Sequence, residues 1–227
     1  MEIGRSGAST ICRRMSDDMD QHQYMLLIYQ VPSQPSAARV SVWRELKKIG
    51  ALYLQQSVCI LPATDALVAA LQKITERITE LSGTYHLLPL HTLPEAEDNK
   101  IVDAFIAQSN LQYDEIIEDC DVNFSKEVEF ETYRQNFTYA EAEEIRQDLD
   151  KIRRWYDRVV ERDLFGAARR DDALRSIERC EKLLEEFEEK VFLRQEEDES
   201  QDPSSEDARK RLHPRRSERR GGHSKPL

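Results

Sequence analysis

The chain has 227 residues, of which 39% are hydrophobic and 34% are charged. A mean hydropathy of -0.69, with no apolar run near the roughly 20 residues that a spanning helix needs, argues against a membrane protein. A chain of this length can bury one core of ordinary domain size, with a second smaller unit docked on it.

Charge is unevenly distributed along the sequence. The net charge of -11 divides into -1 for residues 1–23, +2 for 24–93, -19 for 94–207 and +7 for 208–227. A weakly basic part therefore precedes a strongly acidic one, and a basic tail follows. The acidic segment would repel duplex DNA, because nonspecific binding depends on protein cations that replace condensed counterions. Whether the basic tail binds nucleic acid stays open.

Signals for export, disulfides or zinc are missing from the sequence. Residues 1–23 contain arginines but no apolar segment of a secretory signal, and they are predicted to be a disordered leader. The cysteines are widely spaced and form no CxxC pair, which argues against a zinc site or a disulfide framework: Cys12, Cys59, Cys120 and Cys180. A cytoplasmic location fits this pattern.

The first half of residues 24–93 predicts a buried strand, a helix and two short β runs. Residues 24–31 form a continuous apolar run of the kind found in a central strand. In the following helix apolar residues recur at three-residue steps, and Trp43 is expected in the core: Val40, Trp43, Leu46 and Ile49. Residues 51–54 and 57–61 form either a hairpin, which is favoured, or one bulged strand.

The second half of this segment predicts a helix and a last strand. Thr64 opens the helix, whose apolar face consists of Leu67, Leu71, Ile74 and Ile78, and residues 85–93 form the strand. The order is βαββαβ, and right-handed crossovers give a four-stranded antiparallel sheet with both helices on one face. The predicted fold class is therefore α+β, a ferredoxin-like sandwich at 24–93 followed by an all-α region.

Residues 94–195 predict this all-α region, which contains an antiparallel hairpin. Thr138 and Glu141 form a capping box, and Gly166 lies between the two helices. Two heptad-like seams follow: Ile145, Leu149, Ile152, Tyr156 and Val159, then Leu174, Ile177, Cys180, Leu184, Phe187 and Val191. We expect the seams to pack on the sheet domain through residues 95–130 or on a second copy. Residues 196–227 are predicted to be a disordered tail.

Several motifs resemble the N-terminal domain family of the chromate-resistance protein ChrB. They are RVSVWRELKKIGA at 39–51, LQQSVCILP at 54–62, Tyr113-Asp114, the helix at 139–156 and RDLFG at 162–166. The resemblance extends over 24–195 and implies a role in chromate resistance, since full-length ChrB proteins look like chromate-responsive transcription regulators. Full-length members continue into a further domain where this chain has a charged tail, so an output that needs that domain is not expected of this chain alone.

The βαββαβ part also resembles the central domain of the phenylacetate repressor PaaX and the small CRISPR spacer-acquisition nuclease. Metal-dependent nuclease chemistry would need a carboxylate at the end of the first strand, where this chain has Tyr29-Gln30-Val31. GxSxG, GxGxxG, P-loop and HExxH motifs are also missing. The expectation is a protein that is not an enzyme, and a PaaX-like nucleic-acid-binding transcriptional adaptor is the alternative function.

One helix carries four of the six cationic side chains of the predicted sheet domain. Its candidate anion-binding or partner-binding residues are Arg39, Arg44, Lys47 and Lys48. They can hold phosphate or chromate through charge-assisted hydrogen bonds, although a solvated face paired with the acidic hairpin is the plainer interpretation. A protein partner or a homodimer stays open as well.

Other chemistry-bearing side chains predict no further site. His86 and His91 flank the last strand on opposite faces, so neither a metal site nor a cofactor is expected. Cys59 lies in an apolar strand, where a thiol is usually inert, so direct reduction of chromate is not expected.

Overall fold

The computed structural model describes residues 23–32, 34 and 36–201. The predicted leader at 1–23, apart from Gln23, lies outside the described residues. The predicted tail at 196–227 also lies outside them beyond residue 201.

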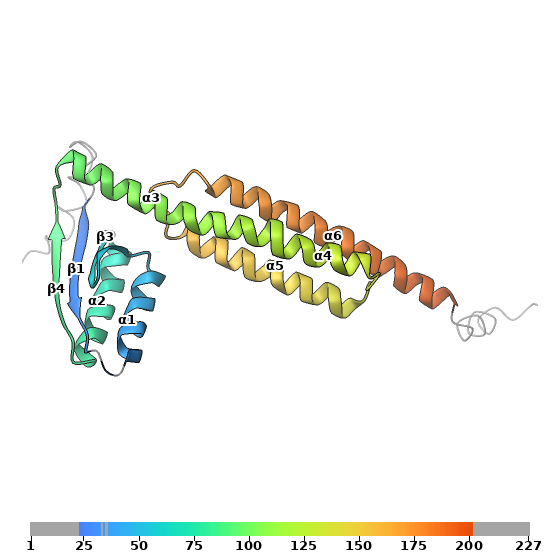
Figure 1. Ribbon diagram of the computed structural model, residues 1–227, viewed down its shortest axis with the longest axis horizontal. Helices are drawn as coiled ribbons and strands as arrows, with labels where there is room; N and C mark the ends of the chain where they lie inside the picture. Colours follow the sequence, from blue (N-terminus) through green and yellow to red (C-terminus); the bar gives the residue numbers. More distant parts are fainter. Residues whose placement is uncertain (1–22, 33, 35, 202–227) are drawn as a thin grey trace, which may run out of the picture. The chain divides into compact units, whose positions relative to one another are not determined.

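The first part of the chain follows the predicted βαββαβ order (Figure 1). Its elements are β1 (Tyr24–Gln30), α1 (Ser36–Lys48), β2 (Leu52–Gln55), β3 (Val58–Pro62), α2 (Asp65–Glu80) and β4 (Thr84–Leu90). The strands form one sheet in the order β2-β3-β1-β4, and each neighbouring pair is antiparallel. The hairpin interpretation of β2 and β3 is confirmed, with a register shift between Tyr53 and Gln55.

Helices α1 and α2 cover one face of this sheet and build its main core. Every second residue of a strand points to the same face, and here Leu27, Cys59 and Leu61 supply that face. They pack against buried side chains of the two helices, which are Ala38, Val42, Leu46, Leu71, Ile74 and Ile78. As predicted, α2 begins after Thr64, whose side chain accepts a hydrogen bond from the Leu67 amide.

The apolar face predicted for α1 is wrong in part. The buried residues are Ala38, Val42 and Leu46, whereas Val40 is 40% and Trp43 is 48% exposed. Residues spaced three apart shift around the helix axis, because each residue turns it by about 100°. Between positions 40 and 49 the apolar stripe therefore moves by about 180° around the helix. Steps of four drift far less, so the 38, 42, 46 row stays on the sheet and Trp43 lies outside the core.

The other face of the sheet is covered at one end by α3 (Glu95–Glu118). Buried Tyr24 and Ile60 pack with Phe105 of this helix. The Tyr24 hydroxyl donates a hydrogen bond of 2.8 Å to the Asp98 carboxylate. The ring of Phe105 lies 5.3 Å from that of Phe165. Both faces of the sheet therefore carry apolar cores.

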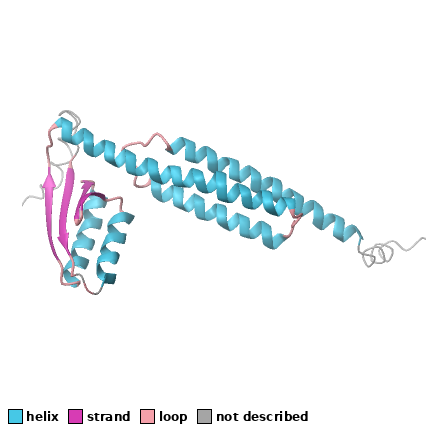
Figure 2. Ribbon diagram, viewed as in Figure 1, coloured by secondary structure: helices cyan, strands magenta, loops and turns pink. Residues whose placement is uncertain are grey.

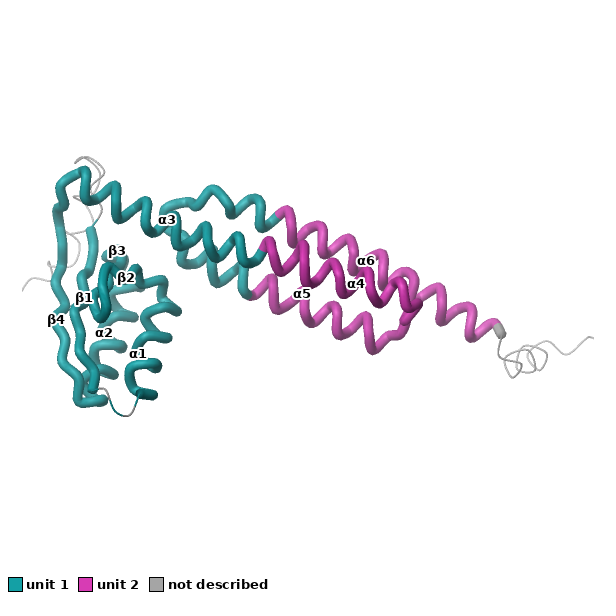
Figure 3. Tube along the Cα trace, in the orientation of Figure 1, with its two compact units in different colours: residues 1–116, 155–174 teal, residues 117–154, 175–227 magenta. Residues whose placement is uncertain are grey.

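The chain divides into two compact units (Figure 3). Unit 1 comprises Met1–Ile116 and Trp155–Leu174, and unit 2 comprises Ile117–Arg154 and Arg175–Leu227. This division does not follow the domain boundary at residue 94 that the sequence suggested. The reason is that α3 and the segment around Phe165 contribute side chains to the core on the sheet face opposite α1 and α2.

Unit 2 is helical in its described residues apart from the connection at 134–138 between α4 and α5 (Figure 2). It contains a π-helical turn at Asp119–Phe124, α4 (Ser125–Tyr133) and parts of α5 (Tyr139–Val160) and α6 (Arg170–Gln201). Ion pairs join Arg146 to Glu188 and Arg153 to Glu181. Advancing seven residues on α5 thus moves seven residues back on α6, which confirms the antiparallel pairing. Helix α6 also extends past the predicted end at residue 195.

The predicted seams are mostly buried, and a third helical segment packs against them. Of the seam residues on α6, only Leu174 is exposed, at 41%, and buried Ala173 takes its place. The Phe137 and Phe187 rings are 5.6 Å apart, and Cys180 Sγ lies 3.7 Å from the Cys120 carbonyl oxygen. Two cysteines that are far apart in the sequence are therefore neighbours in unit 2.

Within the described residues, no helix is both long enough and apolar enough to cross a membrane.

The turn between α5 and α6 is organised by a buried carboxylate. Both oxygens of Asp163 accept a hydrogen bond of 3.0 Å from the Ala167 amide, and the Tyr113 hydroxyl donates to Asp163 at 3.2 Å. Burial raises the pKa of Tyr113, and the Asp163 charge adds to the rise, so the hydroxyl stays protonated. Asp163 therefore ties the turn to α3.

We expect Asp163→Ala to lower the free energy of unfolding by roughly 2–4 kcal/mol, because two buried donors each lose their acceptor at about 1–3 kcal/mol. Exposed Asp157 on α5 offers the control, and Asp157→Ala should stay within about 0.5 kcal/mol of the wild type. Urea unfolding followed by circular dichroism measures both. Equal stability of the two variants would contradict this role of Asp163.

Candidate anion-binding site

The four binding residues predicted on α1 do not line a common pocket. Arg39 lines a pocket at the end of β1, whereas Arg44 lies in a separate depression together with Glu45. Lys48 lines a third pocket near Phe165. Successive residues of a helix are about 100° apart around its axis, so positions 39 and 48 lie on roughly opposite sides of α1.

Lys47 takes part in contacts within unit 1. Its ammonium group donates to the Gln108 side chain at 3.5 Å and lies 5.5 Å from the centre of the Tyr53 ring. The four cations therefore do not form one site. Arg39 is the candidate, because its pocket also contains neutral donors and no carboxylate.

The pocket that contains Arg39, here named the Arg39 pocket, has a volume of about 550 Å³. Ligand pockets usually occupy about 300–1,000 Å³. Its lining comes from the end of β1, from α1, from β2 and from the β2–β3 turn. The lining residues are Tyr29, Gln30, Val31, Arg39, Trp43, Tyr53, Gln55, Gln56 and Ser57.

A pair of tyrosines lies at the wall of the Arg39 pocket. The Tyr29 and Tyr53 hydroxyl oxygens are 2.9 Å apart, and either can donate to the other. Only one proton is used in that bond, so the pair keeps one O–H for a further acceptor. Burial raises the pKa of both tyrosines, and the Tyr29 hydroxyl adds to the rise at Tyr53. Both hydroxyls are therefore protonated at neutral pH and act as donors.

The β2–β3 turn holds the polar rim of the pocket in place. Ser57 has a φ of 63°, in the left-handed region that non-glycine residues adopt mainly in tight turns. Its carbonyl oxygen accepts a hydrogen bond of 2.9 Å from the Tyr29 amide. The turn is thus fastened to the end of β1, and Gln55 and Gln56 lie at the pocket.

The lining of the Arg39 pocket favours an anion. It contains one cation, several neutral donors and no carboxylate. Trp43 lies one helical turn beyond Arg39 and offers an exposed aromatic surface. A guanidinium with neighbouring O–H and amide donors can bind a tetrahedral oxyanion through charge-assisted hydrogen bonds.

Sequence reasoning found Arg39 but missed most of its partners. Tyr29 and Tyr53 belong to apolar runs, and nothing in a run indicates which of its residues end at a pocket. The signal that existed was Gln55-Gln56-Ser57, a polar turn between two β runs.

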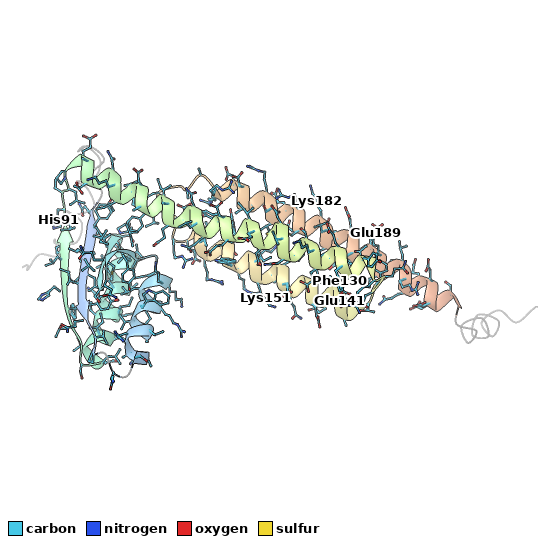
Figure 4. The ribbon with its side chains drawn as sticks, viewed as in Figure 1. His91, Phe130, Glu141, Lys151, Lys182 and Glu189 are labelled. Carbon is cyan, nitrogen blue, oxygen red and sulfur yellow. The ribbon has the colours of Figure 1, made fainter. Side chains whose placement is uncertain are left out.

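Histidines do not form a metal centre in the described part of the chain. His86 lies within β4 rather than beside it, and His91 follows the strand (Figure 4). Among the described residues, no group of three or more histidines, cysteines, aspartates or glutamates could hold a metal ion.

The thiol of Cys59 is part of the core between the sheet and the two helices. Its side chain is 0% exposed, and burial raises its pKa to about 12. At about pH 8 only roughly one thiol in 10,000 would be ionised at that pKa. The reactive thiolate is therefore almost absent.

We expect Cys59 in the native protein to resist N-ethylmaleimide at about pH 8, because alkylation needs both access and a thiolate. Mass spectrometry of the Cys59 peptide measures the label. The same chain in concentrated guanidinium is the control and should be labelled within minutes. Rapid labelling of Cys59 in the folded chain would show that this core opens readily.

A family model described as "Protein ChrB, N-terminal" matches residues 39–198. No curated protein matches the chain. The match includes Arg39 and every lining residue of its pocket on α1, β2 and the β2–β3 turn, whereas Tyr29, Gln30 and Val31 precede it.

Proposed function

The chain belongs to the ChrB N-terminal family, and from this premise we propose that it is a regulatory or sensor module associated with chromate resistance. It binds an oxyanion of the chromate type in the Arg39 pocket and catalyses no reaction. The observation that supports this most directly is the lining of the pocket, where a guanidinium and neutral donors meet without a carboxylate.

The sheet domain is proposed to be of the ferredoxin-like type. The strand order β2-β3-β1-β4 with antiparallel neighbours supports this proposal, as does the packing of α1 and α2 in one core with one face of the sheet. In such a domain α1 links the central strand β1 to the edge strand β2. The Arg39 pocket is formed by the end of β1, α1, β2 and the β2–β3 turn, so its lining spans this connection.

An oxyanion in the Arg39 pocket can act on the protein through the β2–β3 turn. Arg39 is exposed, so it can reorient toward an anion at little cost to packing. The tyrosine pair can supply an O–H donor, and Gln55, Gln56 and Ser57 line the same pocket. A ligand held by all three elements would restrict this turn, which is the conformational signal that a sensor needs.

We expect Arg39→Gln to weaken binding of chromate about tenfold or more, since a charge-assisted hydrogen bond contributes about 1.5–3 kcal/mol. Arg44→Gln removes an equal charge from the same helix but outside the pocket, and its affinity should stay within about twofold. Quenching of tryptophan fluorescence at fixed ionic strength measures binding, because Trp43 lines the pocket. The same titration is repeated with sulfate, a tetrahedral oxyanion that does not oxidise the protein.

Melting temperatures of both variants should remain close to the wild type, because Arg39 and Arg44 are exposed. Equal weakening by the two substitutions would mean that the anion senses only the overall charge of α1. Unchanged binding in Arg39→Gln would overturn the Arg39 pocket as the site. A shift of duplex DNA that depends on Arg39 would instead favour the PaaX-like adaptor.

A further inference from the structure

The pocket near Phe165 that Lys48 lines is at the carboxyl end of α1 and has a volume of about 300 Å³. It is distinct from the Arg39 pocket and shares no lining residue with it. We name it the Arg162 pocket. Its lining residues are Lys48, Ile49, Gly50, Pro62, Thr64, Ala66, Leu67, Phe105, Glu161, Arg162, Leu164 and Phe165.

Most of the wall of the Arg162 pocket is apolar. Phe105 is buried and stacks obliquely with Phe165 at 5.3 Å. Leu164, by contrast, is 48% exposed at the pocket. A ligand in this pocket would cover apolar surface that water now contacts, which favours binding of an apolar group.

Among the described residues, no carboxylate forms an ion pair with the Arg162 guanidinium, although Glu161 also lines the pocket and partly offsets its charge. Nη1 donates to the Lys47 carbonyl oxygen at 3.4 Å and Nη2 to the Gln112 side chain at 2.6 Å. Nε is buried and has no hydrogen-bond partner among the described protein atoms. Burial lowers the pKa of Arg162, and the charge of Arg158 lowers it further. Glu161 partly offsets this, but burying a cation without a close counter-ion remains costly.

The Arg162 stem lies close to the backbone at Gly50, just past the end of α1. Gly50 has a φ of +82°, and a Cβ there would lie 3.2 Å from Arg162 Cβ and 3.4 Å from its Cγ. A side chain at position 50 would therefore press on the arginine stem. The Gly50 carbonyl oxygen also accepts a hydrogen bond of 3.4 Å from Gln108. Arg162 therefore reaches the pocket past a position that only glycine leaves open, and Lys48 adds a second cation to the lining.

We propose that the Arg162 pocket binds a small organic anion with one carboxylate or sulfonate group and an apolar body. The acidic group lies against Arg162 and Lys48, and the apolar body lies against Phe105, Leu67 and Leu164. This site is independent of the oxyanion site proposed at Arg39. A role of Arg162 confined to capping α1 would use its bond to the Lys47 carbonyl, but it would not account for an apolar pocket beside a partly neutralised cation.

Two fluorescent probes test the proposal, because they share an apolar ring system and differ in charge. Anilinonaphthalene sulfonate carries one sulfonate, and N-phenylnaphthylamine carries none. The wild-type chain should bind the sulfonate probe saturably at one site. Arg162→Met keeps an apolar stem and should weaken the sulfonate probe about tenfold or more, since a charge-assisted contact is lost. Binding of the neutral probe should change less than about threefold by the same reasoning.

Two further variants complete the test. Arg158→Met removes a neighbouring charge outside the pocket lining and should leave the sulfonate probe within about twofold. Leu164→Glu places a negative charge at an exposed position of the pocket and should weaken the sulfonate probe strongly while the fold is retained. If Arg162→Met is unstable, Leu164→Glu and Lys48→Met measure the same contact.

The proposal is overturned if the wild type binds the sulfonate probe without saturation, or if Arg162→Met and Arg158→Met bind it equally. Equal affinity of the two probes for the wild type would also overturn it. Arg39→Gln should not alter binding of the sulfonate probe. Failure of this site is therefore distinguishable from failure of the oxyanion site.

Discussion

Burial of β1 on both faces is the constraint on which the rest of unit 1 depends. Leu27 belongs to the core beneath α1 and α2, and Tyr24 belongs to the core on the opposite face. A four-stranded sheet with two helices can cover only one of these faces. The other needs additional chain, which α3 and the segment around Phe165 provide, and the buried bond from Tyr24 to Asp98 joins α3 to the strand.

This arrangement accounts for the position of both pockets along α1. The Arg39 pocket lies where the first half of the helix meets the end of β1 and the β2–β3 turn. At the opposite end, the chain between α5 and α6 packs next to Gly50, and the Arg162 pocket results. One helix thus places a cation at each of these two pockets. A single basic face, which its sequence suggests, would have served only one.

The acidic half of the chain follows a different principle. In unit 2 the helices pair through apolar seams, while ion pairs such as those of Arg146 and Arg153 lie at their edges. Exposed ion pairs of this kind contribute little to stability, so the buried seams hold the helices together. The π-helical turn at Asp119–Phe124 accommodates Cys120 beside Cys180.

Sequence by itself determined the local features of this protein. The βαββαβ order, the hairpin of β2 and β3, the cap at Thr64 and the antiparallel pairing of α5 with α6 follow from short-range periodicity and turn chemistry, which act over a few residues. Arg39 was identified for the same reason, because a cation on a helix is visible in the sequence alone.

Only the tertiary structure decided which of these residues meet. Helical periodicity left the buried face of α1 ambiguous, and packing on the sheet selected Ala38 and Val42 and left Trp43 exposed. Tyr29 and Tyr53 are 24 residues apart and form a pair only because β1 and β2 flank β3. Arg162 is 115 residues from Lys47, and no local pattern connects them. Contacts over such separations depend on how whole elements share buried surface, which is a property of the folded chain.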